Sequence, residues 1–487
     1  MQTRYNAYLT VYLSLIFGIV LSLLFVLIEG AAIGAVRAQA EIVADLGLDS
    51  VFAEYNREIL DQYELFFIDS SYGSINGGIG MVETHLSDYM SYNMTPDKGL
   101  VMPFEHNLLE LRNPYLEISE VSFAGDEQCM VWKAQAVNYM KAVYGGDLVS
   151  RVQEQLSTIE SKGLNNEDAV DKIAAQKQSL EEAFDDKGIV EFGTESAEGY
   201  SYQKVSGIFD QVVGGEILAL TLPAGKSVSN AVMDTEPYFS ARQKAGSINQ
   251  GIGLHDGMHR PEGIVDELIY GEYLMAKCGN YIEPKDTGLL KYQIEYILYG
   301  FNSDAGNLRR SVEVLSALRL AANLTSIYMD SARQSQAEVA AAVICTLLLS
   351  PELTESMTTF ILGSWALAET VSDMRQLLGG GRVPLIKENG DWNISLIDLF
   401  TGNLSGSSYS KNTTGLSYQD YLRIFLGLMD KNTKAARSLD IVEMDIRLTV
   451  GNEHFRIDRC IDYMKVHFGF EDAGGHDFVF YKKMCYE

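Results

Sequence analysis

Charged side chains lie within the most apolar, helix-patterned part of the chain, and they are the residues best suited to chemistry. They include Glu295, Arg319, Glu369, Asp373 and Arg375. Glu369 and Asp373 are four residues apart, which places both carboxylates on one face of a helix. Paired carboxylates near arginines are typical of catalytic or ligand pockets, but such residues more often satisfy one another as a buried polar network that fixes helix register. We interpret this group as structural.

His255 and His259 form the best candidate for a metal site. Two histidines four apart can share a helix face and bind zinc. No glutamate follows His255, as the common zinc-protease motif requires, and Gly257 and Pro261 indicate a loop. We therefore predict solvated loop histidines rather than a metal site, and we expect no cofactor.

Nucleophile motifs are missing from the sequence. It contains no G-x-S-x-G, and none of its five cysteines stands in a CxxC pair, so we predict that the protein is not an enzyme. Cys460 and Cys485 flank a predicted hairpin. A turn centred on 472–473 would place them opposite each other, where a disulfide could form, whereas a turn centred on 474–475 would offset them by four residues. Glycine favours the second turn, and the disulfide stays an alternative.

Hydrophobic periodicity predicts a predominantly α, α+β fold. Two apolar runs, Val339–Pro351 and Ser356–Ala368, are too short to span a membrane and read as buried core helices. The clearest strands are 116–123, 216–223 and the C-terminal pair around Gly474. The predicted segments are 1–63, a membrane helix with a helical extension; 64–147, α/β; 148–187, a helical hairpin; 188–260, β-rich; 261–400, the helical core; and 401–487, α+β with a β-hairpin.

An uncharged apolar segment near the N-terminus predicts a membrane helix. Ala7–Ile28 contains 22 residues, enough to cross a hydrocarbon core of about 30 Å. Arg4 precedes the segment and Glu29 follows it, which favours a cytoplasmic N-terminus and an extracellular C-terminal domain. A cleaved signal peptide is the alternative.

Small residues continue the helix beyond the membrane. Gly30, Gly34 and Ala38 recur every four residues, a spacing that lets two helix backbones approach closely. We predict lateral packing against another helix, with a chance run in an alanine-rich stretch as the alternative.

The chain is strongly acidic. It has 38 Lys and Arg against 66 Asp and Glu, a formal net charge of −28. Such a charge repels nucleic acid, so we expect no nucleic-acid partner, and it is typical of a solvated domain outside the cell.

Four stretches of the sequence resemble an uncharacterised family of Gram-positive bacterial surface proteins associated with Tad (tight adherence, Flp) pilus systems. They are TVYLSLIF with LIEGA near the N-terminus, YQIEYILYG at 292–300, SWALAETVSDMRQLLGGGRVPLIK at 364–387 and GLSYQDYLRIFL at 415–426. The N-terminus is similar to that of TadE-like pseudopilins. This resemblance implies prepilin-type processing between Ala7 and Tyr8, with Tyr12 in place of the pilin glutamate and Glu29 matching the glutamate of TadE-like proteins.

Together these observations predict a non-enzymatic, single-pass membrane protein that assists a Tad-like pilus or secretion system, with other pilus or secretion subunits as its partners. A stand-alone surface adhesin or ligand-binding ectodomain is the alternative. A third possibility, an ectoenzyme, would use the His255 and His259 loop or the carboxylates of the helical core.

Overall fold

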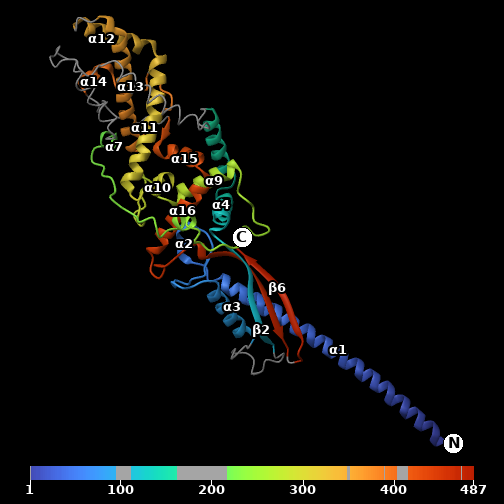
Figure 1. The fold of residues 1–487 in the computed structure, drawn as a ribbon. Helices are drawn as coiled ribbons and strands as arrows, with labels where there is room; N and C mark the ends of the chain where they lie inside the picture. The colour runs from blue at the N-terminus through green and yellow to red at the C-terminus, as the bar shows by residue number, and fades with distance from the viewer. Residues whose placement is uncertain are drawn as a thin grey trace. The chain divides into compact units, whose positions relative to one another are not determined.

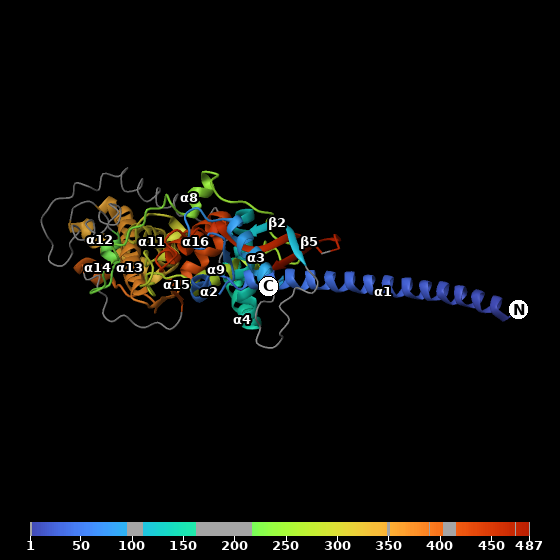
Figure 2. The same ribbon diagram turned by 90° about the horizontal axis from the view of Figure 1, so that it is seen from below.

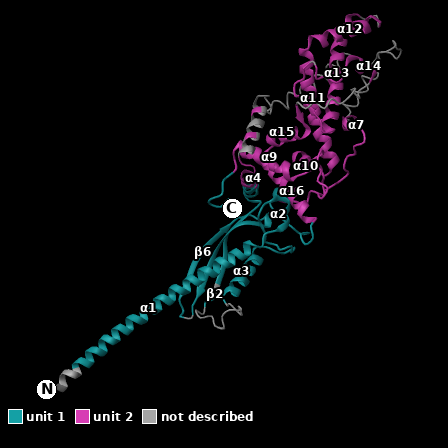
Figure 3. Cartoon of the chain, turned by 180° about the vertical axis from the view of Figure 1, so that it is seen from behind, with its two compact units in different colours: residues 1–135, 243–260, 449–487 teal, residues 136–242, 261–448 magenta. Residues whose placement is uncertain are grey.

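The computed structural model describes residues 2–94, 111–161, 217–347, 351–388, 390–402, 415–472 and 474–486. The chain divides into two compact units, each built from separated stretches of sequence (Figure 3). The sheet unit comprises residues 1–135, 243–260 and 449–487, and the helical unit comprises residues 136–242 and 261–448. The predicted division into consecutive segments therefore differs from the observed one, because the chain leaves the sheet unit and returns to it twice.

A single long helix, α1 (Gln2–Phe52), begins the sheet unit (Figure 1). Its N-terminal half runs clear of the strands in both views (Figures 1 and 2). The large apolar side chains of this half are exposed. From Val36 onward, one face is buried. After α1 ends, Asn56 caps the short helix α2 (Arg57–Tyr63) by accepting hydrogen bonds from two backbone amides. The predicted helical extension to residue 63 is thus two helices.

An antiparallel sheet covers the C-terminal half of α1. The central strand is β5 (Cys460–Glu471), with β2 (Arg112–Phe123) on one side and β6 (Asp477–Cys485) and β1 (Ile68–Asp69) on the other. A short 3-10 helix, Ile457–Arg459, precedes β5. The strand predicted at 116–123 and the C-terminal hairpin are confirmed.

The core of the sheet unit lies between one face of the sheet and two helices, α1 and α3 (Ile79–Met94). Inward side chains recur at alternate positions of β5, as the period of two requires: Met464, Val466, Phe468 and Phe470 are all buried. The two helices approach closely at Gly47, where an added Cβ would lie 2.9 Å from Met90 Cγ. A larger residue at position 47 would therefore force the Met90 and Leu86 side chains to shift.

The helical unit is built around the helix pair α11 (Asp304–Met329) and α13 (Thr354–Leu378). Trp365 and Ile361 of α13 belong to a core to which α11 and α12 contribute. The remaining elements are α4 (Asp126–Ser161, which starts in the sheet unit), α7 (Ile217–Thr221), α8 (Phe239–Lys244), α9 (Ile264–Lys277), α10 (Gln293–Tyr299), α12 (Ser331–Leu347), η2 (Pro351–Leu353), β3 (Arg382–Val383), α14 (Leu396–Thr401), β4 (Leu416–Ser417), α15 (Tyr418–Leu428) and α16 (Lys431–Arg447). The predominantly α, α+β class is confirmed.

Two predictions about this region are wrong. Residues 217–221, expected in a strand, form α7, where Ile217 and Thr221 are buried one helical turn apart. The described part of the segment predicted as β-rich, 217–260, holds short helices, turns and the isolated bridge residue Val232. The first part of the predicted helical hairpin belongs to α4, and residues 162–187 lie outside the described residues.

Helix α12 is less buried than its apolar sequence predicts. It packs on α13 through the small residues Ala337, Ala341 and Cys345. Val339 and Leu347 are exposed on its other side. The run 356–368, in contrast, lies in α13 and is largely buried from Phe360 onward, as predicted, whereas residues 356–359 are partly buried or exposed.

Candidate functional site

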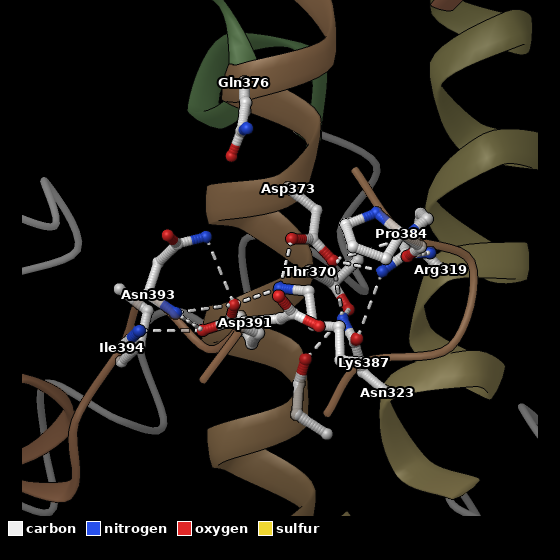
Figure 4. Close-up of polar contacts among 12 residues, drawn as sticks. Arg319, Asn323, Thr370, Asp373, Gln376, Pro384, Lys387, Asp391, Asn393 and Ile394 are labelled. Atoms are coloured by element: carbon white, nitrogen blue, oxygen red, sulfur yellow. Dashed lines mark hydrogen bonds and ion pairs between the residues drawn. The ribbon is translucent and has the colours of Figure 1, made fainter. Parts of the chain in front are cut away.

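The polar residues of the helical core meet where the loop after α13 folds back against α11 and α13. Arg319 and Asn323 lie one turn apart on α11 and face Asp373 of α13 (Figure 4). Glu369 lies one turn before Asp373 on α13. The helix α13 ends at glycines, and Gly380 adopts a φ of +86°, which only glycine reaches without strain. The chain then returns along the helix pair.

Asp373 is the centre of the contacts with α11. Arg319 donates to Asp373 Oδ2 from Nη2 at 2.8 Å and from Nε at 3.1 Å. Asn323 Nδ2 donates to the same oxygen at 2.9 Å. The remaining guanidinium nitrogen of Arg319 donates to the carbonyl oxygens of Pro384 at 2.8 Å and Leu385 at 3.0 Å. Arg319 thereby connects α11, α13 and the loop.

Lys387, which sequence analysis did not single out, lies between the two carboxylates. Its Nζ donates to Asp373 Oδ1 at 2.5 Å and also contacts Glu369 Oε1. Glu369 accepts further hydrogen bonds from the backbone amides of Asn393 at 2.9 Å and Ile394 at 2.8 Å. A signal for Lys387 existed, because it ends the 364–387 stretch that also contains Glu369 and Asp373.

This network is suited to holding the loop rather than to catalysis. All four carboxylate oxygens of Glu369 and Asp373 accept at least one hydrogen bond. The side chains of Arg319 and Lys387 are as buried as those of the two acids, so two cations balance two anions. Burial raises the pKa of Glu369, although Lys387 acts in the opposite direction. The geometry offers a substrate neither an open approach nor an unpaired oxygen.

Two members of the predicted group lie elsewhere. Glu295 of α10 is fully buried and accepts from the Tyr281 backbone amide and the Tyr418 hydroxyl, both at 2.9 Å. Burial raises the pKa of Glu295 to about 7. Arg375 Nε donates to the carbonyl oxygen of Leu220 at 2.7 Å. The structure therefore brings together Arg319, Glu369 and Asp373 but not Glu295 or Arg375.

The two histidines do not share a site. His259 is exposed. The His255 side chain is only 7% exposed, its Nε2 lies 3.5 Å from Asp462 Oδ2, and its ring stacks on Tyr463 at 5.0 Å. The expectation that both histidines are solvated is thus wrong for His255, because its loop lies against β5. Among the described residues, no group of three or more His, Cys, Asp or Glu could hold a metal ion.

Asp462 is a buried acid that sequence analysis missed. Gln135 Nε2 donates to its Oδ1 at 2.5 Å, and burial raises the pKa of Asp462 to about 7. A signal for it existed in the alternation of β5, because Asp462 has the same parity as the inward residues Met464 and Val466.

The cysteines of the C-terminal hairpin are not joined. In the observed register Cys485 is opposite Tyr463, whereas Cys460 is opposite Asp69 of β1. Neither cysteine forms a disulfide. The register centres the turn on residue 474, so the alternative of a Cys460–Cys485 disulfide is wrong.

The predicted helix-packing residues are open in the isolated chain. A Cβ added at Gly30 or Gly34 would have no neighbouring atom within 4 Å, and Ala38 is exposed. Tyr8 is exposed as well, while the side chain of Ala7 lies outside the described residues. By length and composition, α1 could cross a membrane once, although an N-terminal signal sequence has the same properties.

The fold and the network describe an α+β protein with a membrane-compatible N-terminal helix and a helical unit held together by buried ion pairs. Residues 195–472 match the family of unknown function DUF5702. The match covers more than half of the 487-residue chain, so the chain belongs to this family. The comparison with curated proteins found no match, and neither did the comparison with solved structures. The resemblance to an uncharacterised family is therefore confirmed, and its pilus association stays a prediction.

Proposed function

We propose that the protein is a non-enzymatic, membrane-anchored assembly or accessory component of a Tad-like pilus or secretion system, with its globular units outside the cell. The observation that carries this proposal is the division of α1. Its apolar N-terminal half is bare, whereas its C-terminal half is covered by an antiparallel sheet. A pseudopilin-like subunit needs both halves, because the first must pack against other membrane helices while the second holds the external domain.

The exposed small residues support the same role. Gly30 and Gly34 lie just after the apolar segment, before the buried face of α1 begins at Val36, and Ala38 is exposed. Small residues every four positions permit close helix contact within and beside a membrane. The saturated network around Asp373 supports a non-enzymatic role, because its carboxylates are already paired.

Affinity purification of the full-length protein from membranes tests the proposal. Wild type should recover other pilus or secretion subunits, and the double substitution Gly30→Leu with Gly34→Leu should remove them. Ala32→Leu is the matched control, because residue 32 lies about 200° around the helix from both glycines. Recovery of the protein alone, or equal recovery of subunits by the double variant and the control, would contradict the proposal.

A further inference from the structure

The two strands that flank β5, β2 and β6, differ in whether other segments of the chain contact their outer edges. The register of β2 with β5 shifts at three places. Its edge is also engaged, since the Ile118 amide donates to Glu83 Oε1 and Val121 O accepts from the Ile252 amide. The register of β6 with β5 runs through nine residue pairs without a shift. Among the described residues, no backbone hydrogen bond joins residues 477–484 to a segment other than β5.

Strand β6 lacks most of the features that protect free edges. Proteins blunt such edges with proline, bulges, short strands or charged side chains. Here the first half of β6, after Asp477, reads Phe478-Val479-Phe480-Tyr481, and its charged Lys482 and Lys483 lie in the second half. Val479 is 61% exposed and Tyr481 is 59% exposed on the outer face. A regular, apolar, unpaired edge of this kind is a template for another strand.

Helix α1 adds an exposed apolar side chain next to the free edge of β6. Asp45 of α1 is paired with Lys482 of β6 at 3.0 Å, which fixes the flank of α1 that faces β6. Ile42 precedes Asp45 by three residues and therefore lies on the same flank. Ile42 is 58% exposed. A large apolar side chain thus lies uncovered beside an uncovered strand edge.

We propose that β6 accepts an extended segment of a partner protein as an additional antiparallel strand. The backbone of that segment bonds to the free edge of β6, and its inward side chains cover Ile42. Its outward side chains lie beside Val479 and Tyr481, where apolar and β-branched residues pair favourably. An acidic residue near its N-terminal end lies opposite Lys483, because an antiparallel strand begins where β6 ends.

The partner is a different polypeptide and not a second copy. Asp45 contacts Lys482, and further along both elements the ring of Phe52 lies 4.9 Å from that of Tyr486. Helix α1 therefore runs in the same direction as β6. Antiparallel pairing of β6 with a second β6 requires a two-fold axis, which would point the two α1 helices in opposite directions. Two such copies could not insert their apolar N-terminal segments into one membrane.

A synthetic strand can test this surface in the full-length protein in detergent micelles. The probe is a fluorescent nine-residue peptide of alternating valine and threonine with glutamates at its first two positions. Two control peptides carry N-methyl groups on the amides of one edge only. Because valine must face Ile42, one methylated edge lies against β6 and the other faces away. We expect the first control to bind at least tenfold more weakly than the parent peptide, and the second to bind as the parent does.

Substitutions in the protein locate the site. Val479→Lys and Ile42→Asp should each weaken peptide binding at least tenfold without changing the circular dichroism spectrum, because both side chains are exposed. Val450→Lys is the control, since Val450 is 98% exposed in the same unit but outside the sheet. Equal binding of the two methylated peptides would refute strand addition, as would the absence of binding by any peptide. A wild-type dimer that Val479→Lys dissociates would show that the occupant is a second copy. None of these outcomes depends on the helix contacts at Gly30 and Gly34.

Discussion

Replacing Lys387 with methionine is the most direct perturbation of the helical unit. Methionine keeps the apolar stem but removes the cation that lies between Glu369 and Asp373, both of which are fully buried. Arg319 still neutralises Asp373, whereas Glu369 keeps only neutral donors. Removal of one partner from a buried ion pair costs about 3–5 kcal/mol. At about 2–4 °C per kcal/mol for a large domain, the melting temperature should fall by roughly 10 °C.

Tryptophan fluorescence during heating of the full-length protein in detergent measures this loss. Trp365 donates to the Ile394 carbonyl at 2.7 Å, and Lys387 lies 5.7 Å from the centre of the Trp392 ring. Both tryptophans therefore report on the loop that Lys387 holds. The control is Lys291→Met, which removes an ion pair with Asp286 that is open to solvent and should leave the transition unchanged.

Two further results are expected for the Lys387→Met variant if the unpaired charge of Glu369 causes the loss of stability. Adding Glu369→Gln should restore part of the lost stability, because it removes the unpaired charge. The loss of stability relative to wild type should also be smaller at pH 5 than at pH 8. An unpaired buried carboxylate has a folded-state pKa above its unfolded value, so its contribution to stability is lost as pH rises through the folded pKa. A change in melting temperature below about 2 °C, or a double variant less stable than Lys387→Met, would refute the reasoning.

Two other perturbations test the sheet unit. The pKa of Asp462 is raised from 3.8 to about 7, so its contribution to stability is complete below about pH 4 and is lost as pH rises through 7. Asp462→Asn should therefore stabilise the protein at pH 8 by about 4 kcal/mol and flatten its stability between pH 5 and pH 8 in denaturant titrations; a variant with the pH dependence of wild type would exclude Asp462 as its source. Gly47→Val should destabilise the unit by about 1–3 kcal/mol through overpacking against Leu86 and Met90, whereas Gly34→Val, in open space, should leave its melting temperature unchanged. Equal effects of the two glycine substitutions would show that α1 and α3 do not pack closely at residue 47.

Local periodicity predicted the elements whose burial repeats along the chain. The alternation of Met464, Val466, Phe468 and Phe470 identified β5, and its side chains do share one buried face. The strand predicted at 216–223 was wrong because a short apolar run fits a strand and a helix equally well. Its burial at Ile217 and Thr221 follows a helical spacing that only packing reveals.

Partners that are distant along the chain could not be predicted in the same way. Glu369 and Asp373 were recognised from their spacing, but Lys387 reaches them through a loop whose path depends on the end of α13. Glu295 was grouped with them by composition alone, and it lies with Tyr418 instead. The contact between His255 and Asp462 joins residues far apart in sequence. The spacing of residues along the chain predicts which of them share a helix or strand face. Which helices, strands and loops contact one another depends on the paths of the loops.

Helix α1 shows that the sequence alone also does not identify which residues are open to a partner. Its sequence carries apolar or small residues on more than one face, and periodicity alone does not say which face the protein covers. In the structure Val36, Ala40 and Val43 are buried, whereas Gly34 and Ile42 are not. The covered face fixes α1 to the sheet unit, so any partner of α1 must use the apolar N-terminal half or the open flank beside β6. Substitutions at Gly34 and at Ile42 therefore separate association through the helix from association through the strand edge, and a partner lost equally with both would require the two surfaces to act as one.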